Sequence, residues 1–94
     1  MSYAAAFPTF PADAMPALPA GFYDGSYRND VCPRFISDGD RVSIWIDYPD
    51  PDAREYCLMR QFRVTLASID DDIVLETDDW AEALEAAAML ANAE

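Results

Sequence analysis

Residues 33–48 read PRFISDGDRVSIWIDY, and this stretch decides the fold. After Arg41, the side chains of Val42, Ile44 and Ile46 alternate with those of Ser43, Trp45 and Asp47. Such alternation is typical of a β-strand with one buried face. The preceding dipeptide Asp38-Gly39 is the preferred sequence for a two-residue type I′ hairpin turn. We therefore expect residues 33–37 to form the partner strand, with Phe35 opposite Val42.

Two later segments repeat the alternation, residues 61–68 and residues 73–77. Their inward-facing apolar side chains are expected to be Phe62, Val64, Leu66, Ile73 and Leu75. A tight turn at Asp70-Asp71 would pair Leu66 with Leu75, so that the apolar faces coincide and fix the register. The sequence thus predicts an antiparallel sheet with one face that needs a cover.

The last segment supplies that cover. Residues 79–92 repeat apolar side chains at helical spacing, namely Trp80, Leu84, Ala87, Ala88 and Ala91. The preceding Thr77-Asp78-Asp79 offers side-chain oxygens that can cap the first free N–H groups of a helix. The expected fold class is α+β: a four-stranded antiparallel meander with one C-terminal helix packed on one face.

The first twenty residues differ from the rest. Their prolines, Pro8, Pro11, Pro16 and Pro19, predict an extended Pro- and Ala-rich arm, residues 1–20, ahead of a single small domain, residues 21–94. Phe7 and Phe10 make the arm apolar, so we expect it to pack on its own domain or on a partner, and we favour its own domain. One of these rings could cover Trp45.

Charge excludes several classes of function. The chain has 18 acidic residues, six basic residues and no histidine, for a net charge of −12. Such a charge opposes direct binding to nucleic acid or to an anionic membrane. The six basic residues are all arginine, and residues 70–94 contain nine acids and no base. The acidity is therefore a property of one end of the chain.

Catalytic, cofactor and metal sites are not expected. Without histidine, the chain lacks the commonest general base and the commonest metal ligand. The two cysteines, Cys32 and Cys57, are interpreted as small semi-buried apolar side chains in a reduced compartment, with a disulfide between them as the alternative. The acids of residues 47–55 resemble loop and helix-cap residues more than a calcium loop, because prolines interrupt them. We expect a protein that is not an enzyme and has no cofactor.

The candidate partner-binding residues are the acids of the last hairpin and helix, with one tryptophan. Trp45 is included because arginines flank it in the expected sheet, a composition typical of interface hot spots. Asp70 to Asp72 could instead be a solvated hairpin tip that protects a sheet edge. The set is Asp70, Asp71, Asp72, Glu76, Asp78, Asp79, Glu82, Glu85 and Trp45.

Three short motifs carry a resemblance to a family. They are Asn29-Asp30-Val31-Cys32-Pro33, Ile46-Asp47-Tyr48-Pro49-Asp50-Pro51 and Thr77-Asp78-Asp79-Trp80. Together they resemble uncharacterised small acidic proteins of alphaproteobacteria and their plasmids or phages, over roughly residues 21–85. The resemblance implies a bacterial or phage origin and no activity.

Two hypotheses for function follow. The first is a small acidic protein-binding module of the inhibitor, immunity or anti-defence type, including a nucleic-acid mimic, that docks on a basic partner surface. The second is a structural or assembly subunit whose N-terminal arm joins a larger complex. A cytoplasmic location is expected, because the N-terminus lacks the features of a signal peptide and no apolar run reaches the ~18 residues of a membrane span.

Overall fold

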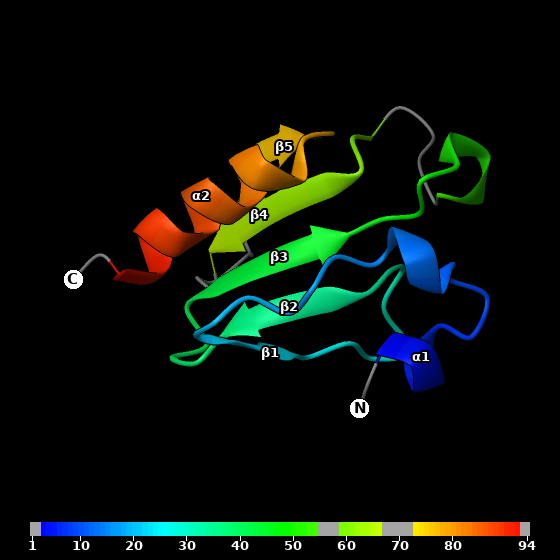
Figure 1. Cartoon of the computed structure of the whole chain (residues 1–94), viewed down its shortest axis with the longest axis horizontal. Helices are drawn as coiled ribbons and strands as arrows, with labels where there is room; N and C mark the ends of the chain where they lie inside the picture. Colours follow the sequence, from blue (N-terminus) through cyan, green and yellow to red (C-terminus); the bar gives the residue numbers. More distant parts are fainter. Residues whose placement is uncertain (1–2, 55–58, 67–72, 93–94) are drawn as a thin grey trace.

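The computed structural model describes residues 3–54, 59–66 and 73–92. Five antiparallel strands form one sheet in the order β1-β2-β3-β4-β5, so each strand pairs with its neighbour in the chain (Figure 1). The strands are β1 (Phe22–Asp24), β2 (Arg34–Ser37), β3 (Val42–Ile46), β4 (Phe62–Leu66) and β5 (Ile73–Thr77). The other elements are α1 (Tyr3–Ala6), the 3₁₀ turns η1 (Ala12–Ala14) and η2 (Pro51–Ala53), and α2 (Trp80–Asn92). The α+β class, the antiparallel meander and the C-terminal helix are confirmed.

The prediction of four strands is wrong, because β1 adds a fifth. This strand has only three residues and pairs Phe22 with Ser37 and Asp24 with Phe35. Gly21 and Gly25 stand on either side of it, and Gly21 has a φ of +82°. Three residues between two glycines are too few to produce a recognisable alternation. Pairing with an already formed β2 gives the segment its conformation.

The main core lies between the sheet and α2. Val42, Ile44, Ile46 and Val64 are fully buried on the covered face of the sheet. Ala83 and Ala87, also fully buried, lie at the centre of the buried helix face. Their small side chains let the helix approach the strands closely. Each fully buried aliphatic side chain of the sheet contributes roughly 1.5–3 kcal/mol relative to an exposed one.

Two contacts fix the N-terminal end of α2. The carboxylate of Asp79 accepts a hydrogen bond from the backbone N–H of Ala81 at 3.0 Å, which confirms the expected helix cap. The ring of Trp80 packs against Phe35 and Phe62, with centroid separations of 6.2 and 5.3 Å. The helix therefore starts where its first side chain reaches the core.

The hairpin between β2 and β3 differs from the expected one. Phe35 pairs with Ile44, not with Val42, so four residues connect the strands instead of two. The backbone N–H of Asp40 bonds to the carbonyl of Ser37, and Asp40 has a φ of +58°. The Ser37 hydroxyl accepts from the N–H groups of Arg41 and Val42, which stabilises the longer loop. Because the shift is two residues, every side chain keeps its face.

The pairing of β4 with β5 is also shifted. Val64 lies opposite Leu75, and a β-bulge falls between Val64 and Thr65. The expected pairing of Leu66 with Leu75 is therefore wrong. Beyond the bulge, Ile73 pairs with Thr65 and is 53% exposed, so the expectation that Ile73 points inward is wrong as well. The expected turn at Asp70-Asp71 lies outside the described residues.

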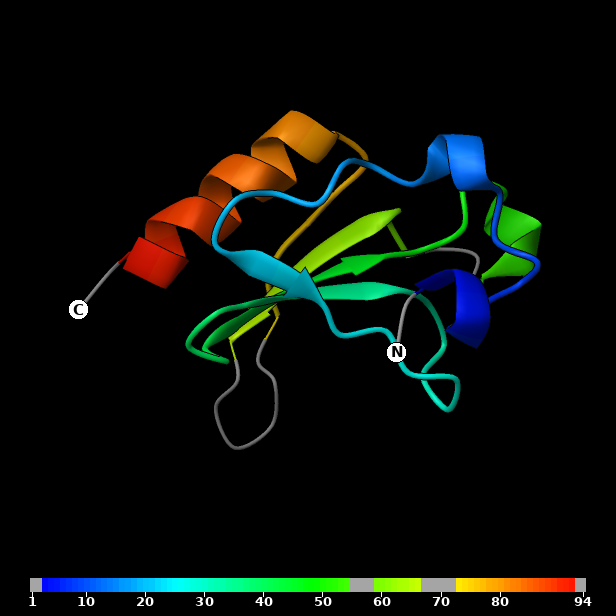
Figure 2. The same cartoon turned by 60° about the horizontal axis from the view of Figure 1, so that its bottom comes forward.

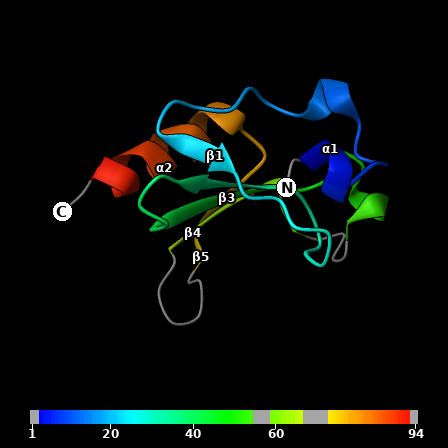
Figure 3. The ribbon, with the colours of Figure 1, turned by 90° about the horizontal axis from the view of Figure 1, so that it is seen from below.

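The N-terminal segment is not continuously extended, since it contains α1 and η1. Phe7 and Phe10 are buried in the same core cluster as the sheet, and Phe10 packs on Tyr48 with ring centroids 4.9 Å apart. The segment thus packs on its own chain. It runs from η1 across the sheet toward α2 (Figure 2) and lies on the same side of the sheet as the helix (Figure 3). The expectation that Phe7 or Phe10 covers Trp45 is wrong, because Trp45 faces the other side.

Within the described residues, no helix is both long enough and apolar enough to cross a membrane.

Candidate interaction surfaces

The face of the sheet opposite α2 carries a row of four side chains from four strands. The strand registers place Arg34 beside Trp45, Trp45 beside Arg63, and Arg63 beside Glu76. The guanidinium of Arg34 lies 4.5 Å from the centroid of the Trp45 ring. The indole N–H of Trp45 donates to the hydroxyl of Thr65 at 3.0 Å. Trp45 is half-buried, and interactions within the chain already occupy its ring face and its one polar atom.

One member of this row, Arg63, forms a buried ion pair. Arg63 donates to the carboxylate of Asp47 at 3.2 Å, and both side chains are more than nine-tenths buried. The other carboxylate oxygen of Asp47 accepts from the N–H of Tyr48 at 2.8 Å. Arg63 also contacts the sulfur atoms of Cys32 and Met59. This cluster fastens the segments before β2, after β3 and before β4 to one another.

Cys32 is a free thiol with no exposed surface. Burial raises the pKa of this thiol to about 12, and the negative charge of Asp47 raises it further. The thiolate that would act as nucleophile or metal ligand is therefore suppressed near neutral pH. Cys57 lies outside the described residues.

The candidate acids do not lie together in one place. Glu76 belongs to the row on the open face of the sheet, on the opposite side from the helix. Asp78 bonds to the backbone N–H of Gln61 at 2.8 Å and to Arg60 at 2.9 Å, and these two contacts, in that order, lower the pKa of Asp78. Asp79 caps the helix. Asp70, Asp71 and Asp72 lie outside the described residues.

Glu82 and Glu85 remain as acids without a local role. They lie on the solvent-facing side of α2 and line a shallow depression of about 390 Å³ together with Asp79, Ala81, Ala86 and Met89. Met89 is 68% exposed, more than any other large apolar residue described. Neither glutamate forms an ion pair within the described part of the chain. The structure therefore does not bring Trp45 and these acids into one surface.

The acidic stretch that follows β3 has a structural role. Asp50 accepts from the backbone N–H of Asp52 at 3.0 Å and so caps η2, as the sequence predicts. Arg54 donates to the carbonyl groups of Tyr48, Pro49 and Met59, which closes this loop. Glu55 is not among the described residues. In the described ranges, no group of three or more Cys, Asp or Glu side chains has the geometry of a metal site.

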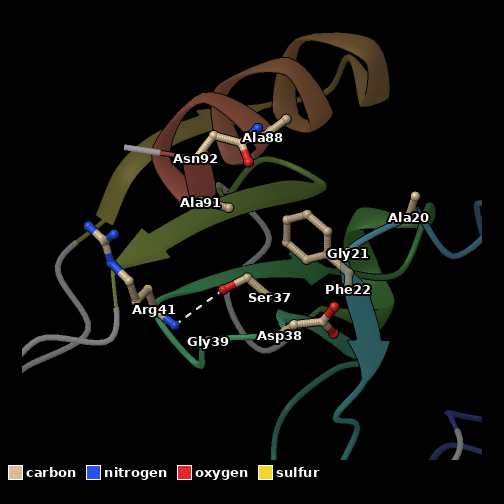
Figure 4. Close-up of a pocket in the computed structure, with 10 residues that line it drawn as sticks. All are labelled: Ala20, Gly21, Phe22, Ser37, Asp38, Gly39, Arg41, Ala88, Ala91 and Asn92. Carbon is tan, nitrogen blue, oxygen red and sulfur yellow. Dashed lines mark hydrogen bonds between the residues drawn. The ribbon is translucent and has the colours of Figure 1, made fainter. Parts of the chain in front are cut away.

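A cleft that the sequence did not indicate opens between the C-terminal half of α2 and the loops at one end of β1 and β2 (Figure 4). Its volume is about 250 Å³. Phe22 and Ser37 belong to its lining, and its rim includes Asp38, Arg41 and Asn92. The remaining lining residues, Ala20, Gly21, Gly39, Ala88 and Ala91, have a methyl group or no side chain at all. Small residues scattered over three distant segments give no local sequence signal.

Comparison with known proteins gives no family. The chain matches no protein-family model, no curated protein and no solved structure. No match bears on the resemblance to small acidic proteins of alphaproteobacteria.

Proposed function

We propose that the chain is a small acidic protein-binding module that docks on a basic partner surface through the solvent-facing side of α2. The observation that carries the proposal is the depression on this helix, where Glu82 and Glu85 flank the exposed side chain of Met89. An apolar side chain that a partner can bury, surrounded by charges of one sign, provides both contact area and steering. The helix has no basic residue to offset these charges.

The use of the other acids favours a compact docking site over an extended nucleic-acid mimic. Asp79 caps the helix, and Asp78 is engaged by Arg60 and Gln61. A mimic would need a continuous row of carboxylates that is free to replace phosphates. An inhibitor, immunity or anti-defence protein of the simpler docking type needs only the helix surface.

The burial of Phe7 and Phe10 in the chain's own core weighs against the alternative of an assembly subunit. In that alternative the N-terminal segment would have to leave its own core to join a neighbour. Exposure of two large aromatic side chains would cost several kcal/mol, at roughly 1.5–3 kcal/mol each.

The test is capture of proteins from a lysate of the source cells on the immobilised full-length chain, at about 0.1 M and about 1 M salt. We expect a basic protein that is retained at low salt only. The variant Glu82→Gln/Glu85→Gln should weaken its binding by up to about tenfold, the effect of two exposed charge pairs.

The matched control is Asp13→Asn/Asp52→Asn, which removes the same net charge from exposed positions away from this helix face. It should bind like the wild type. Equal weakening in both variants would mean that only net charge matters and would contradict the docking site. Displacement of the captured protein by duplex DNA would instead support the hypothesis of a nucleic-acid mimic.

A further inference from the structure

We propose that the cleft between α2 and the β2–β3 hairpin receives one lysine or arginine side chain of the basic partner. This inference rests on the proposed function and adds a second point of contact, on a different side of α2 from Glu82 and Glu85. The cleft and the helix depression share no lining residue.

The size and lining of the cleft suit a long side chain with an apolar stem. A volume of about 250 Å³ accommodates one large side chain and excludes a folded element. The ring of Phe22 lies between Ala91 of the helix and the hairpin residues (Figure 4), and Ala88 adds a methyl group from the preceding turn. A methylene chain of lysine or arginine can lie along such a surface while its charged end stays at the rim.

The rim favours a positive charge. The carboxylate of Asp38 is exposed there, and its backbone N–H is fixed by a hydrogen bond to the carbonyl of Gly21 at 2.9 Å. The helix ends at Asn92, so the partial negative charge of its C-terminal end lies at the same opening. No basic residue stands in the last turn of α2 to offset it. The net charge of −12 adds a long-range attraction for cations.

Arg41 also lines the cleft, but its charged end is directed elsewhere. Its backbone N–H donates to the hydroxyl of Ser37 at 3.2 Å, which holds its main chain at the cleft wall. Figure 4 shows the guanidinium pointing away from the ring of Phe22. In the same view the carboxylate of Asp38 lies on the other side of that ring, so an incoming cation can reach Asp38 without meeting this group.

The experiment is a titration of the full-length chain, followed through its backbone amide signals by NMR. The probes are the acetylated, amidated derivatives of lysine and arginine, with those of norleucine and citrulline as uncharged controls that keep the same stems. We expect saturable shifts at Gly21, Gly39, Ala88 and Ala91 with millimolar affinity for the two cationic probes. Because Asp38 is exposed, the uncharged probes should bind only about two- to fivefold more weakly.

Two variants and one control separate binding in the cleft from attraction by the general acidity. Ala88→Leu fills the cleft and should abolish the shifts, whereas Ala12→Leu, at an exposed position in η1, should leave them unchanged. Asp38→Asn should lower the affinity for the cationic probes by about two- to fivefold, so that it equals the affinity for the uncharged probes.

Equal binding of lysine and norleucine derivatives by the wild type, or no saturable shift up to about 50 mM of any probe, would overturn the proposal. Because the titration uses no partner, its failure is distinguishable from failure of the proposed function. If the titration fails but capture of the partner still depends on Glu82 and Glu85, the proposed docking through α2 remains supported.

Discussion

On the face of the sheet that α2 covers, the buried groups of the core are apolar, whereas on the opposite face they include a carboxylate and a guanidinium. Val42, Ile44 and Ile46 belong to an apolar core. Asp47 and Arg63 are buried as completely as many core residues, but they are held by directed hydrogen bonds. The covered face is stabilised by the volume of its buried side chains, and the open face is stabilised by the pairing of its buried charges. The two faces should therefore respond differently to substitution.

The largest effect is expected from Asp47→Ala. It leaves Arg63 buried without its counter-charge, which typically costs about 3–5 kcal/mol of unfolding free energy. Urea denaturation measures the loss. The double variant Asp47→Leu/Arg63→Met, which replaces the pair by apolar groups, should recover most of it. A single variant as stable as the wild type would mean that the ion pair has no structural role.

The corresponding change on the covered face is Ile44→Ala. The side chain is fully buried, so removing its atoms should cost about 2–5 kcal/mol through lost burial and the cavity left behind. Ile44→Val should cost only about 0.5–1.5 kcal/mol. Urea denaturation should therefore show a loss of stability that grows with the number of atoms removed from the covered face. At the ion pair, by contrast, removal of either partner alone should be strongly destabilising. Equal losses of unfolding free energy for Ile44→Ala and Ile44→Val would contradict the view that this face is stabilised by the volume of its side chains.

A smaller effect is expected at Gly25, next to the end of β1. A Cβ atom added there would lie 2.7 Å from Cγ1 of Ile36, on the open face. Gly25→Ala should therefore destabilise the protein by about 1–3 kcal/mol. Ile36→Ala removes the obstructing atoms, so the double variant should be less destabilised than the sum of the single ones. Strict additivity in this double-mutant cycle would argue against the close contact.

The smallest effect is a dependence on pH. Burial raises the pKa of Cys32 in the folded state to about 12, well above that of an exposed thiol. Its contribution to stability is complete below the pKa of the unfolded thiol and declines as the pH rises toward the folded value. In a Cys57→Ser background, unfolding free energy should fall by about 1 kcal/mol between about pH 8.5 and about pH 10. Cys32→Ala in the same background should remove this dependence, and a flat profile with Cys32 present would contradict the expected shift.

The sequence predicted the covered face better than the open one. The long aliphatic alternation of β3 and the helical spacing of α2 are local signals, and both elements are present. The registers were wrong by two residues, because turn length depends on contacts such as those of the Ser37 hydroxyl. The β-bulge after Val64, which exposes Ile73, likewise has no local signal.

The candidate sites depended on tertiary contacts that alternation does not report. From the sequence, Asp47 belongs to a group of loop acids, and the arginines expected beside Trp45 carry no signal of burial. The burial of Asp47 and Arg63 needs Cys32 and Met59, which come from other segments. The cleft beside α2 arises in the same way. By contrast, the helix cap of Asp79 was predictable, since its partner is two residues away.

The sequential order of the strands has a consequence for how the chain folds. Each strand pairs with the next one along the chain, so every sheet contact closes a short loop, which favours rapid folding. The contacts of Thr9 and Phe10 with Tyr48 join positions almost forty residues apart, and the packing of Trp80 on Phe35 also joins distant parts of the chain. Closing this long loop is entropically costly until Tyr48 is fixed at the end of β3. We therefore expect the N-terminal segment to dock after the sheet has formed.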